Sequence, residues 1–340
     1  MLSSIARSPP LVFVVLVGGV VALVALGSLV GLGTSVNAQA ILAVHVGWWW
    51  LVLAAAVNLV SILAKGAVWK AALEPVRAVG RVTWRAVVSA MFVGFLVNTV
   101  LAARVGEVAR VAVLKRRLRL EGLDVRFATI AGTVVAEQVV LGLALVLFVG
   151  SLALVVPLPG WVGWSLAGVA TLLAVAGLAL GLAVWSSRRR SGPAARTGAS
   201  RFTRLVEALM AGQAVFGRPR LAAVALGASL VSWVAQVLAI LLTLDAFGIH
   251  RGLAAAALVF VATTLASLFP VLPASIGIFQ GAVSVVLVSA YGVAPAVALA
   301  FSVALQLVEM VFGVGLGVAF LAAEGLSLQT TRTLIAHERH

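Results

Sequence analysis

Nine long runs of apolar residues, almost free of charge, limit what this chain can fold into. They lie at 11–31, 41–64, 86–103, 128–156, 161–185, 221–247, 253–269, 274–291 and 294–322. A membrane-spanning helix needs about 20 apolar residues in succession, and most of the runs are that long. The runs do not alternate apolar with polar residues, which excludes an outer-membrane β-barrel. The pattern predicts an all-α, polytopic integral membrane protein with about six to eight transmembrane helices.

The small number of charges excludes a soluble enzyme and a disordered chain. Of the 340 residues, 63% are hydrophobic and 10% are charged, whereas soluble domains carry roughly 25% charged residues. The chain has no cysteine, and its four histidines are scattered along the sequence. Thiolate and paired-histidine sites are therefore ruled out, and we expect no metal site and no cofactor.

The net charge of +14 is compatible with either nucleic-acid binding or an excess of basic residues in cytoplasmic loops. The basic residues stand between the apolar runs and in the two tails, and they form no separate domain. This placement favours the second interpretation. We expect no nucleic acid as a partner.

The run 86–103 is flanked by basic clusters at 65–85 and 104–126. If every run crossed the membrane, the 24 basic residues would divide 17 to 7 between the two sides. If 86–103 enters and returns on one side, with 104–116 as the returning arm, the division becomes 23 inside to 1 outside. The bias of Lys and Arg toward the cytoplasm favours this re-entrant arrangement. A re-entrant segment must be surrounded by protein or water, so we expect a cavity there.

A second break, Phe-Pro-Val-Leu-Pro at 269–273, divides the stretch 253–291 into two spans or into a second re-entrant hairpin. With the hairpin, residues 1–340 form a single transmembrane domain of two similar halves, 11–156 and 161–322. Each half crosses the membrane three times, which gives the inverted repeat typical of transporters. A cytoplasmic loop at 188–220 and a short cytoplasmic tail at 323–340 complete this prediction. Both termini then face the cytoplasm, and the protein belongs in the cell membrane.

Polar residues concentrate where the first hairpin turns back. The run from Asn98 to Arg110 contains Arg104, Gly106 and Glu107, and both arginines stand three residues from Glu107, one helical turn away. Ionisable groups within a membrane are costly and mark either a pathway or an ion pair that anchors a helix end. Both interpretations remain open at this stage.

The last span of each half carries one deep carboxylate, Glu137 or Glu309. Glu137 lies about ten positions into its span, roughly 15 Å deep at 1.5 Å per residue. We expect Arg104 to be its partner, with a protonated Glu137 between helices as the alternative.

Several other residues are interpreted as structural. Asn58, Gln236 and Asp245 are expected to bridge helices by hydrogen bonds, and Gly313 with Gly317 to pack helices closely. Trp69 is expected at the cytoplasmic interface. Apolar side chains recur at helical spacing within 202–216, which fits a helix lying on the membrane surface or a solvated connector.

These motifs resemble those of the flippase domain of bacterial lysylphosphatidylglycerol synthases and its stand-alone relatives. The first motif is Asn98 followed by Arg104-Val105-Gly106-Glu107-Val108-Ala109-Arg110. A Glu-Arg pair in the next span appears here as Glu137-Gln138. The third motif is a Pro/Gly-rich break followed by a polar residue, here Pro273, Gly277 and Gln280, where the family has Glu in place of Gln280. In the last span, Gln306 stands where the family often has Arg, one turn before Glu309.

The resemblance, which covers about 11–322, implies a protein that moves a lipid with a polar, phosphate-containing head group between leaflets. Ten residues are then expected to line its substrate site: Asn98, Arg104, Gly106, Glu107, Arg110, Glu137, Pro273, Gly277, Gln280 and Glu309. Membrane lipids are the expected partners, and a homo-oligomer and a separate lipid-modifying enzyme are compatible with the sequence.

Two further functions remain open from the residues themselves. One is an intramembrane enzyme acting on a lipid or a polyprenyl carrier, although no nucleophile–base pair is visible. The other is a membrane scaffold whose cavity transports nothing. The sequence ends shortly after the last span, so we expect no aminoacyltransferase domain and no lipid synthesis.

Overall fold

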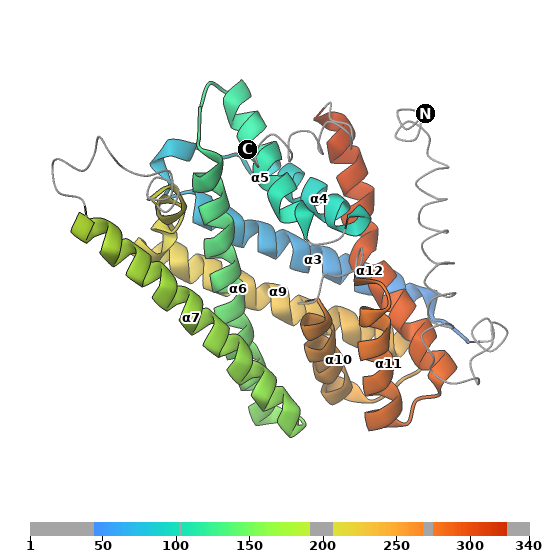
Figure 1. The fold of residues 1–340 in the computed structure, drawn as a ribbon. Coiled ribbons are helices and arrows are strands. Elements are labelled where there is room, and N and C mark those ends of the chain that lie inside the picture. Colours follow the sequence, from blue (N-terminus) through green and yellow to red (C-terminus); the bar gives the residue numbers. More distant parts are fainter. Residues whose placement is uncertain (1–43, 102–103, 191–206, 268–274, 325–340) are drawn as a thin grey trace. The chain divides into compact units, whose positions relative to one another are not determined.

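The computed structural model describes residues 44–101, 104–190, 207–267 and 275–324 (Figure 1). These ranges contain helices and turns but no strand, which confirms the prediction of an all-α protein. Four elements of the prediction lie outside the described residues. They are the first span at 11–31, Pro273, the loop residues 191–206 and the tail from 325 onward.

Four of the described helices are long and apolar enough to cross a membrane: α3 (Trp48–Leu73), α6 (Phe127–Val155), α9 (Pro219–Ala246) and α12 (Pro295–Ala323). They contain 26, 29, 28 and 29 residues. At 1.5 Å per residue they are about 39–44 Å long, which exceeds the roughly 30 Å hydrocarbon core of a bilayer. A further helix, α7 (Gly160–Arg190), covers the predicted span 161–185. The chain is therefore a multi-pass membrane protein.

Two pairs of shorter helices occupy the segments predicted to enter and return. The first pair is α4 (Trp84–Val100) and α5 (Val105–Leu120), and the second is α10 (Gly252–Ala266) and α11 (Ile278–Tyr291). With 14 to 17 residues each, these helices are about 21–26 Å long, too short to span the hydrocarbon core unless the bilayer becomes thinner around them. The order of long helix, short pair and long helix occurs twice along the chain. This order agrees with an inverted repeat, while the orientation of each half stays a prediction.

The hairpin turns follow from local backbone chemistry. Arg104 has a φ of 52°, so the chain turns in the left-handed region immediately before α5. The second turn has the same feature at Ser275, and Gly277, with a φ of 88°, caps α11. Such backbone conformations cost energy in residues other than glycine, and they persist where surrounding contacts hold them.

The chain divides into two compact units, each described here by itself. Unit 1 contains the described residues up to Ser61, Phe92–Gly106, and the described residues from Val234 onward. Unit 2 contains Ile62–Met91 and Glu107–Trp233.

Unit 1 is built around α10, α11 and α12, of which α11 packs against both others (Figure 1). Its core includes Ala54, Leu242 and Val308, one residue each from α3, α9 and α12. Gly317 lies against the backbone of Phe92, so α12 approaches α4 closely at this point. This contact agrees with the packing role predicted for Gly313 and Gly317.

Unit 2 packs α6 against α7 and includes the short helix η2 (Arg77–Val79). One part of its core joins Val68, Val140 and Ala225, from α3, α6 and α9. The described part of the connector between α7 and α9 also belongs to this unit. It contains a short helical stretch at 207–211 and η3 (Ala214–Gly217).

The connector packs directly on α6. The side-chain amide of Gln213 donates to the carbonyl oxygen of Gly132 (2.8 Å), and the backbone at Leu209 and Gly212 lies against Gly132. Val215 is fully buried among Ala72 and Ala136. Residues 207–217 therefore pack on α6 through their inner side, where glycines on both segments allow the two backbones to touch.

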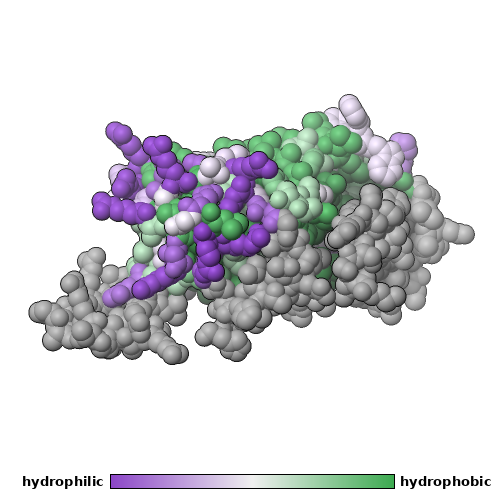
Figure 2. Space-filling view, turned by 90° about the horizontal axis from the view of Figure 1, so that it is seen from above, coloured by the Kyte–Doolittle hydropathy of each residue, from purple (hydrophilic) through white to green (hydrophobic). Residues whose placement is uncertain are grey.

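The surface is divided by polarity. Figure 2 shows hydrophilic side chains gathered on one part of the face, next to hydrophobic ones. In unit 2 the exposed basic residues include Arg77, Arg81, Arg85, Arg119 and Arg126 from the two clusters at 65–85 and 104–126, and Arg218 and Arg220 at the start of α9. Large apolar side chains are also exposed, among them Trp49 at 82% and Leu154 at 88%. Such exposure is typical of a surface that contacts lipid.

Candidate functional site: a buried guanidinium between two carboxylates

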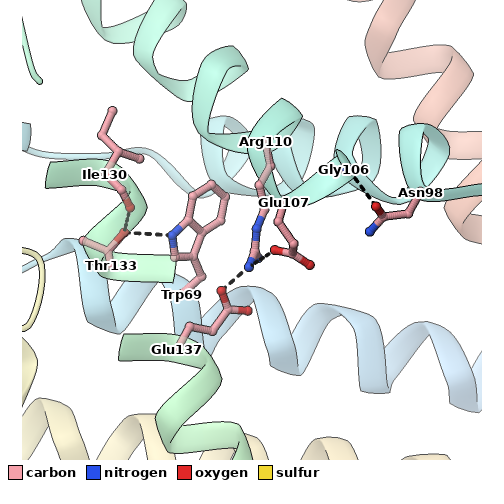
Figure 3. Close-up of polar contacts among 8 residues, drawn as sticks. All are labelled: Trp69, Asn98, Gly106, Glu107, Arg110, Ile130, Thr133 and Glu137. Atoms are coloured by element: carbon pink, nitrogen blue, oxygen red, sulfur yellow. Dashed lines mark hydrogen bonds and ion pairs between the residues drawn. The ribbon is translucent and has the colours of Figure 1, made fainter. Parts of the chain in front are cut away.

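The most unusual feature of unit 2 is a charged cluster inside the protein, centred on Arg110 of α5 (Figure 3). The Arg110 side chain is only 6% exposed, and that of Glu137 on α6 is 2% exposed. Arg110 Nη1 lies 2.8 Å from Glu137 Oε2, and Arg110 Nη2 forms a second ion pair with Glu107. One guanidinium thus joins two carboxylates from two helices.

The sequence places these groups by simple helix geometry. Glu107 and Arg110 are three residues apart on α5, so their side chains share one face of the helix. Glu107 stands in the first turn of α5, where a negative charge complements the positive end of the helix dipole. Glu137 is ten residues past the start of α6, about 15 Å along that helix.

A tryptophan supports the guanidinium. The Arg110 Cζ atom lies 4.9 Å from the centre of the Trp69 ring, a cation–π distance. The indole N–H of Trp69 donates to the Thr133 hydroxyl (3.0 Å), and that hydroxyl donates to the carbonyl oxygen of Ile130 (2.7 Å). Trp69, near the end of α3, is fully buried within the protein. Its indole holds α3 against α6 and leaves one ring face for Arg110.

One N–H donor of the cluster has no hydrogen-bond acceptor among the described residues. A guanidinium has five N–H donors, and the buried Nε of Arg110 has no acceptor within the described ranges. Lys65 of α3 adds a second positive charge that acts on Glu137. The guanidinium between the two carboxylates lowers the cost of burying them.

The turn of the first hairpin, in unit 1, is built by Asn98 and Gly106. The side-chain oxygen Oδ1 of Asn98 accepts from the backbone N–H of Gly106 (2.6 Å), one of the N–H groups that the first turn of a helix leaves unpaired. Gly106 lies directly against the backbone of Gly94, so a side chain has no room there.

Arg104 has a different role from the one predicted. Its guanidinium donates to the carbonyl oxygen of Ser267 at the end of α10. The prediction that Arg104 pairs with Glu137 is therefore wrong, and Arg110 occupies that place. The reason is geometric: Arg104 belongs to the turn, whereas Arg110 lies inside α5 on the same face as Glu107.

The second hairpin, in unit 1, carries neutral polar groups that link its helices. Gln280, buried on α11, accepts from the backbone N–H of Gly277 (2.7 Å) and donates to Gln306 on α12. These two glutamines, 26 residues apart in sequence, join α11 to α12 through uncharged side chains.

Glu309 belongs to a separate polar network in unit 1. Its Oε1 accepts from the side-chain amide of Gln236 (2.8 Å), and the Asn58 amide donates to the backbone oxygens of Val308 and Glu309. The helix-bridging roles predicted for Asn58 and Gln236 are therefore confirmed. Asp245 instead lies 3.6 Å from His250 near the end of α9.

A comparison with protein families identifies the chain. The model described as the lysylphosphatidylglycerol synthase TM region matches residues 11–317. The chain belongs to this family. The resemblance seen in the sequence motifs is thereby confirmed, and with it a membrane domain of flippase-like type. No curated protein and no solved structure matches the chain.

In this family member the predicted site residues separate into two groups. Glu107, Arg110 and Glu137 come together in unit 2, whereas Asn98, Arg104, Gly106, Gly277, Gln280 and Glu309 lie in unit 1. Trp69 and Thr133 were not predicted to be part of the site. Thr133 precedes Glu137 by four residues on one helix face, a spacing that could have indicated it. No three His, Asp or Glu side chains in the described ranges are placed to hold a metal ion.

Proposed function

We propose that this protein moves a lipid with a phosphate-containing polar head group from one leaflet of the membrane to the other. Membership of the family described as the lysylphosphatidylglycerol synthase TM region supports an activity on membrane lipids. The observation that carries the proposal is the buried Arg110, held between a deep carboxylate and a more accessible one. Ionisable groups kept at such cost inside a membrane protein usually belong to a substrate pathway.

The chemistry of the cluster favours phosphate. A guanidinium can bind two phosphate oxygens at once through parallel N–H donors. Glu107 is 36% exposed, whereas Glu137 is 2% exposed, so Glu107 is the carboxylate that an arriving head group can replace. Glu107 returns to Arg110 when the lipid leaves, which keeps the buried guanidinium paired throughout. Arg104, exposed at the start of α5, attracts the anionic head group to this end of the helix.

The proposal includes a location and partners. The protein lies in the cell membrane, with the basic clusters and both termini toward the cytoplasm. Membrane lipids are its substrates, and a separate enzyme that modifies lipid head groups is a fitting partner. A homo-oligomer is compatible with this arrangement.

The orientation can be tested with one introduced cysteine, because the chain has none of its own. Arg119→Cys places a thiol at an exposed position near the end of α5. We expect a membrane-impermeant maleimide to leave it unlabelled in intact cells and to label it after the cells are opened. Labelling in intact cells would contradict the re-entrant assignment of the α4–α5 hairpin.

The transport activity itself is tested by leaflet-resolved lipid movement in proteoliposomes. Fluorescent phosphatidylglycerol and phosphatidylethanolamine are compared with fluorescent glucosyldiacylglycerol, which has a polar head group without phosphate. We expect the purified protein to move the two phospholipids at least tenfold faster than protein-free vesicles do. The glycolipid should move at the protein-free rate. Equal movement of all three lipids would contradict the selection for a phosphate-containing head group. If none of the three lipids moves faster than in protein-free vesicles, the proposed transport is contradicted.

A further inference from the structure

A second polar network crosses unit 1 halfway along three membrane-length helices. Glu309 is the middle residue of the 29-residue α12, about 21 Å from either end. Ser61 lies near the middle of α3, and Gln236 lies in the inner part of α9. The apolar cluster of Ala54, Leu242 and Val308 fastens the same three helices together beside this network. A carboxyl group at this depth is costly to keep without a function.

Two side-chain hydrogen bonds of the network lead from Ser61 through Gln236 to Glu309. The Ser61 hydroxyl donates to Gln236 Oε1 (3.2 Å), and Gln236 Nε2 donates to Glu309 Oε1 (2.8 Å). Asn58, which is buried, donates to the backbone oxygens of Val308 and Glu309 at 3.2 and 3.3 Å. Side chain and backbone of Glu309 thus both accept hydrogen bonds from amide groups of neighbouring helices.

This arrangement suits a carboxyl group that changes its charge. Because Ser61 donates to the Gln236 oxygen, the NH₂ group of Gln236 must face Glu309. An NH₂ group only donates, so Glu309 Oε1 remains an acceptor whether the carboxyl group is charged or neutral. A proton must then be bound at Oε2. Glu309 as a whole is partly exposed.

We propose that Glu309 is a proton-exchanging group that couples lipid movement to a proton gradient. In each cycle, one proton leaves water on one side and forms an O–H bond at Oε2, which neutralises the carboxylate. The O–H bond breaks later, and the proton enters water on the other side while the negative charge returns. The coupling rests on the proposed lipid transport, whereas proton binding at Glu309 does not.

Other charged and titratable groups lie on the helices that pack around this carboxyl group. They are Lys65 and Lys70 on α3, Arg220 and Asp245 on α9, Arg85 on α4 and Tyr291 on α11. Lys65 follows Ser61 by one helical turn on α3, so it is the charge nearest the network along that helix. A Lys65→Met variant is included in the experiments below for this reason.

Proton binding is measured first, without lipid transport. Infrared difference spectra of the purified protein are recorded between alkaline and acidic buffer. We expect a carbonyl band of a protonated, buried carboxyl group, absent from Glu309→Gln and shifted in frequency in Glu309→Asp. Lys65→Met should retain this band. A band that persists unchanged in both Glu309 variants would overturn the proposal.

Coupling is measured in proteoliposomes with an imposed pH gradient, fluorescent phosphatidylglycerol and a pH-sensitive dye inside. In the wild type we expect the gradient to raise the rate of lipid movement at least tenfold. Glu309→Gln keeps an acceptor oxygen for Gln236 but cannot bind a proton there, so it should lose the increase that the gradient produces. Glu74→Gln, at an exposed position, should behave as the wild type.

The outcomes separate the two proposals. The proton coupling is overturned if the gradient does not change the rate of lipid movement in the wild type. It is also overturned if the gradient raises the rate equally in Glu309→Gln. Neither result contradicts the proposed lipid transport. A wild type that moves no lipid contradicts the proposed function, and the infrared band then decides alone whether Glu309 exchanges a proton.

Discussion

Arg110→Gln should lower the free energy of unfolding by about 3–5 kcal/mol, the cost of removing one partner from a buried ion pair. The substitution leaves the carboxylate of Glu137, 2% exposed, without the guanidinium that lies 2.8 Å away. It also removes the cation from the face of the Trp69 ring. Unfolding by sodium dodecyl sulfate in mixed micelles, followed by circular dichroism, measures the change.

Two further variants separate charge pairing from general damage. Arg119→Gln removes an exposed arginine from the end of the same helix and should leave stability unchanged. The double variant Arg110→Gln with Glu137→Gln removes both charges, so it should recover a large part of the stability that Arg110→Gln loses. A double variant less stable than Arg110→Gln would show that the pair is not the source of the effect.

Gly106→Ala should destabilise the first hairpin by about 1–3 kcal/mol or more, as overpacking of a closely packed site does. A methyl group at residue 106 would overlap the backbone oxygen of Gly94 and the side chain of Asn98. The helices α4 and α5 would have to separate, and the hydrogen bond between Asn98 and the N–H of Gly106 would be lost. Thermal unfolding of the purified protein in detergent measures this change.

Gly281→Ala provides the matched control in the second hairpin. A methyl group at Gly281, on α11, meets no atom within 4 Å. Alanine also favours a helix more than glycine does, so this variant should be as stable as the wild type or slightly more stable. If both alanine variants unfold at the same temperature, the close approach at Gly106 does not hold the hairpin.

The helices could be predicted from sequence because a membrane allows few alternatives. Backbone groups in lipid must be hydrogen-bonded within the segment, so long apolar runs become helices. The distribution of Lys and Arg separated the run 86–103 from the others, and the structure has a helix of 17 residues there. The Pro- and Gly-containing break likewise lies between two short helices, α10 and α11.

The partners inside the site were harder to predict, because they depend on how helices rotate about their axes. The spacing of Glu107 with Arg104 and with Arg110 is the same, and the sequence alone does not choose between them. The choice is made by the turn: Arg104 takes a left-handed backbone conformation outside α5, and only Arg110 projects from the helix toward Glu137.

Trp69 shows a second limit of sequence patterns. A tryptophan near the end of an apolar run is typical of a membrane interface. Here the hydroxyl of Thr133, 64 residues away, accepts the indole N–H and allows the whole ring to be buried. A contact between residues so far apart in sequence leaves no local signal.

The most direct test of the central claim is the rate of phosphatidylglycerol movement in proteoliposomes for Arg110→Gln against Arg119→Gln, at equal amounts of folded protein. If the guanidinium of Arg110 holds the lipid phosphate, Arg110→Gln should lower the rate at least tenfold, while Arg119→Gln keeps the wild-type rate. Arg110→Lys should recover only part of the rate, because an ammonium group cannot bind two phosphate oxygens through a planar fork. A folded Arg110→Gln protein that moves phosphatidylglycerol at the wild-type rate would contradict the account.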